Sequence, residues 1–131
     1  MRLFKSKIIC AQLTHTELLA LEEDFKSYKS TESLPRNFGR DELYDHPNTL
    51  PIVKAESVRH IHLEDAKHPW PVFLDQFHKT SDVHLVYCES DMTADCYLLM
   101  AILSPNAHAL ARNNNWMFKL GKMAEAFRQR Y

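Results

Sequence analysis

The stretch VHLVYCESDMTADCYLLMAIL, residues 83–103, contains two apolar runs separated by a short polar segment. Residues 83–89 predict a strand, and a turn around residues 90–94 leads the chain into CYLLMAIL at residues 96–103. This second run is apolar on both faces, so we expect a central strand that is covered on both sides. The two runs therefore predict the middle of an antiparallel sheet.

A further strand is expected just upstream, over residues 52–63, with a break or bulge near residues 55–57. Within VRHIHLED, residues 58–65, side chains at i and i+2 share a face of the strand. Ile61 and Leu63 suit a core, and His60 and His62 then lie together on the opposite face. Two titratable side chains on one strand face are either exposed to solvent or form the floor of a site.

The remaining segments complete the predicted order. Residues 3–10 predict an edge strand with lysines, and residues 14–30 predict a helix that begins with a capping box of Thr14 and Glu17. Residues 35–51 have the composition of a loop, with one helical turn at residues 41–44. Ser104 and Pro105 predict a helix start, as N-cap and first helical residue. The three asparagines at residues 113–115 predict a bend between two helices.

The order β, α, loop, β, β, β, α predicts an α+β fold. We expect a small antiparallel sheet with an N-terminal helix and a C-terminal helix packed on it, in a single domain over residues 1–131.

Composition limits the classes of function. The formal net charge is −1, with 16 basic and 17 acidic residues, whereas a protein that binds RNA unaided usually has a basic excess. The three cysteines form no CxxC pair, which favours a reduced, cytoplasmic setting. No segment approaches the roughly 20 apolar residues that span a bilayer, so no membrane partner is expected.

Three clusters are candidates for chemistry. The first is His60 with His62, and the second is HKTSDVH at residues 78–84, which mixes acid, base and hydroxyl groups beside a strand. The third is a helical face that carries His108, Arg112, Lys119 and Lys122, and such faces can hold phosphates. Each cluster also has a plain interpretation as solvated polar surface.

A metal site is an alternative for the first cluster, because HxH often forms half of one. The candidates for completing it are His84, His78, His68, Asp82 and Glu64. No H-x3-5-H or HExxH spacing is present, so we expect no metal and no cofactor. Proton-transfer groups with a few cations and no metal motif are what metal-independent RNA cleavage requires.

Several segments spread over the chain resemble the YafO family of type II toxin–antitoxin toxins. They are NFGRDELYD at residues 37–45, VRHIHL at 58–63, TSDVHLVYC at 80–88 and ILSPNAHALARNNNWMFKLGKMAEAFR at 102–128. The resemblance implies a RelE-like microbial RNase fold and ribosome-dependent endonucleolytic cleavage of mRNA, which inhibits translation. It also implies three partners: the ribosome, the translated mRNA and a cognate antitoxin, with DNA contacted only indirectly through the antitoxin complex. Because the ribosome would present the mRNA, tight binding of free RNA is not required.

In related toxins the site lies on the concave face of the sheet and at the start of the last helix. The resemblance therefore implies His60 or His62 as general base, His84 or His108 as general acid, and Asp82 orienting a histidine. Arg112 and Lys119 would stabilise phosphate charge, and Arg59, Lys79 and Lys122 would also bind RNA or phosphate. His15, His46 and His68 are interpreted as bystanders in helix-cap or loop positions. The alternatives are a non-catalytic protein that blocks the ribosome and a histidine-based metalloenzyme.

Overall fold

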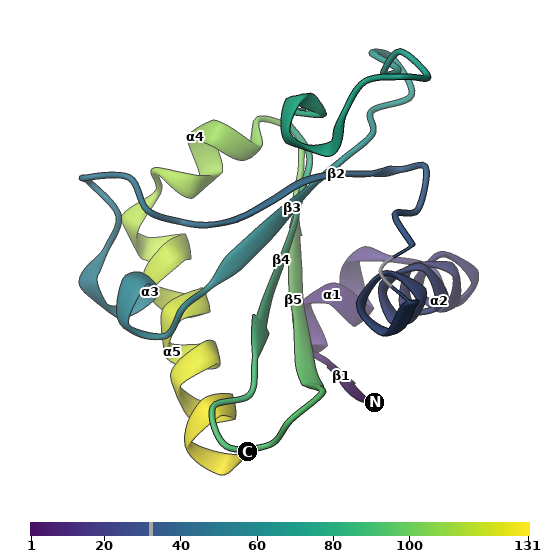
Figure 1. Cartoon of the computed structure of the whole chain (residues 1–131). Coiled ribbons are helices and arrows are strands. Elements are labelled where there is room, and N and C mark those ends of the chain that lie inside the picture. Colours follow the sequence, from purple (N-terminus) through teal and green to yellow (C-terminus); the bar gives the residue numbers. More distant parts are fainter. Residues whose placement is uncertain (32) are drawn as a thin grey trace.

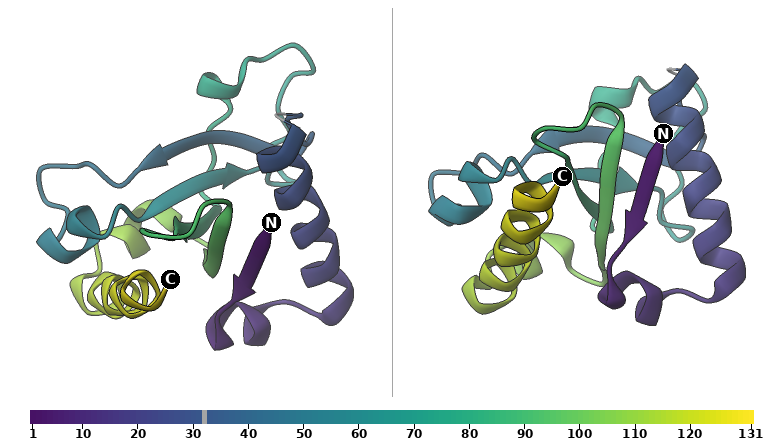
Figure 2. Two further views of the ribbon diagram at one scale, coloured as in Figure 1. Left: turned by 60° about the horizontal axis from the view of Figure 1, so that its bottom comes forward. Right: turned by 90° about the horizontal axis from the view of Figure 1, so that it is seen from below.

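The computed structural model describes residues 1–31 and 33–131, in which a five-stranded sheet lies between two layers of helices (Figure 1). The strand order is β1-β5-β4-β3-β2, with bounds of β1 Arg2–Lys5, β2 Phe38–Leu43, β3 Arg59–Leu63, β4 His84–Glu89 and β5 Cys96–Leu103. Helices α1 (Lys7–Gln12) and α2 (His15–Thr31) cover one face of the sheet. The other face carries α3 (Pro51–Ala55), α4 (Ala107–Ala111) and α5 (Asn114–Arg130), and Figure 2 shows α2 and α5 on opposite sides.

The two central strands confirm the prediction from residues 83–103. β4 and β5 pair antiparallel, and nearly every residue of β5 is buried. Val86 and Met100 pack in the core under α5, while Leu85, Tyr87 and Leu99 pack under α2. Alternate side chains of these strands therefore enter two separate cores, as expected of strands that are covered on both faces.

The predicted first strand is too long, and the sheet is mixed rather than antiparallel. Only Arg2–Lys5 is a strand, and it pairs parallel to β5 at an edge of the sheet. Ser6 then begins α1, because its hydroxyl accepts a hydrogen bond from the Ile9 N–H and donates one to the Met100 carbonyl at 2.6 Å. A polar N-cap within an apolar run ends the strand and starts the helix.

Residues 35–63 differ most from prediction. β2, at Phe38–Leu43, lies in the segment predicted as a loop and replaces the expected helical turn. Its composition of glycine and charged residues is poor for a strand, and pairing with β3 and the burial of Phe38 stabilise it instead. The expected strand over residues 52–63 is a short helix, Pro51–Ala55, followed by β3. The predicted break near residues 55–57 marks the boundary between the two.

The helices follow their expected patterns with one exception. The capping box of α2 is present, with Thr14 N–H and Glu17 N–H each bound by the other residue's side chain. Asn113 caps α5 through a 3.0 Å bond from the Trp116 N–H, so the last segment is two helices as predicted. Ser104 is not the N-cap: α4 begins after Asn106, which adopts a left-handed conformation. Within residues 1–31 and 33–131, no helix has both the length and the apolarity to cross a membrane.

Candidate active site

Three histidines of neighbouring strands lie together on the sheet face that α3, α4 and α5 cover. His62 and His84 are direct cross-strand partners in β3 and β4, and His60 lies two residues before His62 on the same face. Their ring centroids are 4.3 Å apart for His62 and His84, and 4.6 Å apart for His60 and His84. The exposed fractions are 5% for His60, 3% for His62 and 2% for His84, so these side chains are a buried floor rather than a solvated face.

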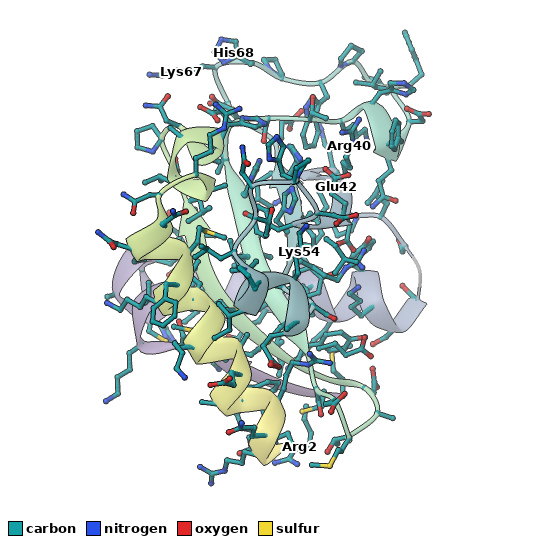
Figure 3. All side chains as sticks on the ribbon, turned by 90° about the vertical axis from the view of Figure 1, so that its left-hand side faces the viewer. Arg2, Arg40, Glu42, Lys54, Lys67 and His68 are labelled. Atoms are coloured by element: carbon teal, nitrogen blue, oxygen red, sulfur yellow. The ribbon has the colours of Figure 1, made fainter. Side chains whose placement is uncertain are left out.

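The floor opens into a pocket of about 1080 Å³. Figure 3 looks onto this side of the molecule, where Arg40 and Glu42 of β2 are labelled above Lys54 of α3. The wall comes from β2, the loop after it, the residues before β4, and the α4 region. The polar side chains that line the pocket include Arg40, Glu42, Tyr44, His46, His60, His62, Thr80, Ser81, His84, His108 and Arg112. A concave pocket with converging polar groups is the usual form of a ligand site.

Burial keeps the three floor histidines neutral. It is the main cause that lowers the pKa of His60 to about 2, of His62 to about 4 and of His84 to about 3. Neighbouring imidazoles add to the effect, because two adjacent positive charges in a dry site repel one another. At neutral pH each of these rings therefore has an unprotonated nitrogen.

His108 and Asp82 form a hydrogen-bonded pair at the rim. The His108 Nδ1 lies 2.8 Å from Asp82 Oδ1, and the same oxygen accepts the His108 backbone N–H at 3.0 Å. The backbone bond is the first cause, and the imidazole bond a further one, of the lowered pKa of the Asp82 carboxyl group. Both side chains are substantially exposed, at 62% for His108 and 45% for Asp82. The pair therefore places an oriented imidazole beside a carboxylate where solvent and substrate reach it.

The structure brings the predicted His60, His62, His84, Asp82 and His108 into one cluster. The His108 ring centroid lies 5.2 Å from that of His84 and 6.2 Å from that of His62. Arg112, at the end of α4, lines the same pocket. The sequence had placed these residues in three separate clusters.

Sequence reasoning missed the wall that β2 contributes. Tyr44 stacks on the His60 ring at 4.0 Å, and its hydroxyl lies 3.4 Å from His84 Nδ1. Glu42 Oε1 lies 3.7 Å from His60 Nε2. Arg40, Glu42 and Tyr44 recur at every second position, a pattern that would have placed them on one face if residues 38–43 had been recognised as a strand. His46, interpreted as a bystander, also lines the pocket, from a loop where its Nδ1 accepts the Asn48 N–H.

The four other predicted RNA-binding residues lie outside the pocket lining. Lys119 and Lys122 are exposed on α5, where Lys122 pairs with Glu125 at 2.7 Å. The Lys79 ammonium lies 5.8 Å from the Trp70 ring, beside a smaller pocket. These lysines remain candidates for contacts with an extended RNA rather than for contacts with the reacting phosphate.

Arg59 has a different partner. Its guanidinium donates to the Asp41 carboxylate and to the Tyr87 hydroxyl, both at 3.2 Å. Tyr87 belongs to the core under α2, on the opposite side of the sheet from the histidines. Since Asp41 is 7% exposed, the arginine compensates a carboxylate that is nearly buried. The expectation that Arg59 binds phosphate finds no support in this arrangement.

Comparison with known proteins identifies the family. The sequence model described as "Toxin YafO, type II toxin-antitoxin system" matches residues 26–129, a range that contains every residue of the site. The chain belongs to the YafO family of type II toxin–antitoxin toxins. It is also similar to the mRNA interferase toxin YafO of Escherichia coli (strain K12), with 54% identity over the full length of both chains. No solved structure matches it.

Proposed function

We propose that this YafO-family protein is an mRNA interferase: an endoribonuclease that cleaves mRNA on the ribosome and thereby inhibits translation. The observation that carries the proposal is the Asp82–His108 pair at the rim of a pocket floored by neutral imidazoles, in a chain of this family. We further propose that the sheet and its helices are a variant of the RelE-like fold, and that a cognate antitoxin neutralises the protein by binding it.

The proposed reaction needs a base, an acid and cations, and no metal. A base removes the proton of a ribose 2′-hydroxyl, and the 2′-oxygen attacks the adjacent phosphorus. The bond from phosphorus to the 5′-oxygen breaks, and an acid protonates that leaving oxygen. The products are a 2′,3′-cyclic phosphate and a 5′-hydroxyl, so atoms and protons balance.

His108 suits the role of acid. The Asp82 carboxylate holds its Nδ1 and stabilises the imidazolium, which leaves Nε2–H to be given to the leaving oxygen. The alternative acid, His84, has a pKa of about 3, which leaves it unprotonated at neutral pH. The hydrogen bond to Asp82 and the position at the rim therefore both favour His108.

His62 suits the role of base. His62 Nδ1 accepts the Ser81 N–H at 2.8 Å and lies 3.0 Å from the Ser81 carbonyl. The role of base requires the tautomer whose Nδ1–H the carbonyl accepts, because that tautomer leaves the Nε2 lone pair free. The pKa of His62 is the highest of the three floor histidines, and a base is more effective as its pKa approaches the working pH. A ring-centroid separation of 6.2 Å from His108 leaves room for a phosphate group between base and acid.

Two arginines line the same pocket and supply positive charge for the pentacoordinate phosphorus. Arg112 is exposed beside α4, and Arg40 reaches the wall from β2, where its Nε donates to the Phe77 carbonyl at 2.6 Å. Fixed cations that meet charge as it develops lower the barrier more than mobile solvent does. Lys79, Lys119 and Lys122 are proposed to contact RNA outside the reacting centre.

The test is primer extension on a defined mRNA with purified ribosomes. We expect cleavage by the wild type that a zinc chelator does not reduce and that His108→Ala reduces about 10²-fold or more. His78→Ala is the matched control, because His78 also pairs with an aspartate, Asp75, on an exposed surface outside the pocket. Translation that stops while the mRNA stays intact would instead support a non-catalytic ribosome blocker.

A further inference from the structure

We propose that His60, His62 and His84 form a binding site for a divalent transition-metal ion such as Zn²⁺, and that the bound ion switches off RNA cleavage. The inhibitory half of this inference rests on the proposed function, because it assumes that a neutral imidazole of this cluster serves as the base. The binding half rests on the arrangement of the three rings alone.

The ring positions come close to those of a three-histidine metal site. One nitrogen from each ring can be chosen so that all three lie within 4.8 Å of one another. Zinc with ligands at 2.0–2.1 Å in tetrahedral geometry places its nitrogens about 3.3 Å apart. The nitrogens therefore lie somewhat farther apart than zinc requires. Neighbouring strands already hold the rings together, since His62 and His84 are direct cross-strand partners, so small rotations of the rings would shorten these separations.

Two ring nitrogens of the cluster lack hydrogen-bond partners. His60 Nδ1 and His84 Nε2 are buried and have no hydrogen bond to any residue in the described part of the chain. Buried polar atoms are satisfied in the great majority of cases, so two such atoms in adjacent imidazoles require an explanation. A shared cation supplies one, because a neutral imidazole offers its lone pair to zinc.

The opposite nitrogen of each ring already faces a group that suits an outer contact. Glu42 lies 3.7 Å from His60 Nε2, the Tyr44 hydroxyl lies 3.4 Å from His84 Nδ1, and the Ser81 carbonyl lies 3.0 Å from His62 Nδ1. Metal-bound histidines usually donate their second N–H to a carboxylate, a carbonyl or a similar oxygen. The surroundings of His60 and His84 therefore suit the tautomers that a metal ion requires. His62 Nδ1 also accepts the Ser81 N–H at 2.8 Å, so binding the ion through Nε2 would exchange that bond for one to the Ser81 carbonyl.

Occupation by a metal ion would remove the proposed base. A lone pair shared with Zn²⁺ cannot accept the 2′-hydroxyl proton, and the ion would add positive charge beside His108. The fourth coordination position would face the pocket, where water or a phosphate oxygen of bound RNA could fill it. Binding is therefore expected to inhibit, even though an open coordination position also occurs in catalytic zinc sites.

The binding test uses the full chain, freed of metal by a chelator and then titrated with Co²⁺. We expect visible absorption bands of a low-symmetry Co²⁺ site that saturate at a single ion per chain and disappear when Zn²⁺ is added. His62→Ala and His84→Ala should abolish the bands, whereas the exposed His68→Ala should keep them. His108→Ala should keep them as well, which shows that the site is distinct from the Asp82–His108 pair. A folded wild type with no such bands would overturn the inference, whatever its activity.

The activity arm compares metal-free protein with protein loaded with Zn²⁺ and separated from excess ion by gel filtration. We expect the loaded form to cleave ribosome-bound mRNA at least about tenfold more slowly, and EDTA to restore the rate. Equal rates in both forms would overturn the inhibitory role and leave the proposed function standing. Cleavage that requires the ion would overturn both inhibition and metal-independent catalysis. A protein that cleaves in neither form would overturn the proposed function while the Co²⁺ result still decides the site.

Discussion

The four clustered histidines differ in what surrounds each ring, and the surroundings assign their chemistry. His60, His62 and His84 are held neutral by burial, whereas His108 lies at the rim against the Asp82 carboxylate. In the proposed reaction one residue type therefore supplies both the proton acceptor and the proton donor in the same pocket.

The charge of Asp82 can be separated from its hydrogen bonds. Asp82→Asn keeps an oxygen that accepts from the His108 N–H but loses the charge that stabilises the imidazolium. We expect kcat for cleavage of ribosome-bound mRNA to fall by about 10–10²-fold with KM little changed. Asp75→Asn, in the matched exposed pair with His78, should leave both constants unchanged. Equal losses in the two variants would mean that Asp82 has no special role.

The floor histidines also predict acid sensitivity of the fold. Their pKa values in the folded protein, about 2 to 4, lie below the value of about 6.5 that an unfolded chain has, so the unfolded state takes up protons first as pH falls. Stability is fully present above about pH 6.5 and is lost progressively toward pH 4.

Urea unfolding in EDTA at pH 7 and pH 5 measures this loss. We expect about 1–2 kcal/mol for each imidazole that stays neutral, and a smaller loss in a folded His84→Gln variant. A midpoint that does not change between the two pH values would contradict the burial of these rings as neutral groups.

Sequence reasoning named residues that the structure brings together, but it did not predict their environment. His60, His62, His84, Asp82 and His108 were all identified as candidates, because alternation along a strand and a mixed acid–base segment are visible in the sequence. The burial of His60, His62 and His84 was not predictable, since it depends on elements that are remote in the chain from β3. The hydrogen bonds of Arg59 to Asp41 and Tyr87 could not be predicted either, because these partners belong to the other strands β2 and β4.

At the scale of elements, the predictions succeeded where a local pattern alone determines structure. CYLLMAIL and the capping box of α2 are such cases. They failed where tertiary contacts override propensity, as in β2, whose sequence FGRDEL contains glycine and three charged residues. That strand is stabilised by β3 on one side. On its other edge lies the loop that carries the short 3-10 helix η1 (Gln76–His78), where the Arg40 N–H donates to the Lys79 carbonyl at 2.9 Å.

Gly39 tests how tightly that loop covers β2. A Cβ atom at this position would overlap the Lys79 carbonyl oxygen and would lie 2.7 Å from the Trp70 ring. Because backbone atoms cannot move aside cheaply, we expect Gly39→Ala to lower the free energy of unfolding by about 2 kcal/mol or more. Urea denaturation followed by circular dichroism measures the change.

Gly121 of α5 is the comparison for Gly39. There a Cβ would meet only the Ile52 side chain, at 2.6 Å, and a helix gains up to about 1 kcal/mol from alanine in place of glycine. Gly121→Ala should therefore cost less than Gly39→Ala. The reverse order would show that the loop over β2 is loosely held.

At the scale of the whole molecule, charge and pocket together point to a substrate that another particle presents. The chain has 16 basic and 17 acidic residues, so few phosphates of a free RNA would be neutralised on binding. The pocket nevertheless brings together the proposed acid, the proposed base and two arginines. The proposed chemistry on RNA is therefore not accompanied by an excess of positive charge that would capture free RNA.

This contrast predicts a large difference between free and ribosome-bound mRNA. Positioning by the ribosome converts a weak bimolecular encounter into an oriented one, an effect that can exceed 10⁵-fold, and we expect at least about 10³-fold faster cleavage on programmed ribosomes than on the same naked mRNA. Primer-extension time courses at equal mRNA and protein concentrations measure the ratio, and His108→Ala in both reactions shows whether the same pocket acts in each. If naked mRNA were cleaved as fast, and still through His108, the protein would have to bind free RNA through a local group of cations despite its net charge of −1. The exposed lysines of α5 would then be the first residues to replace.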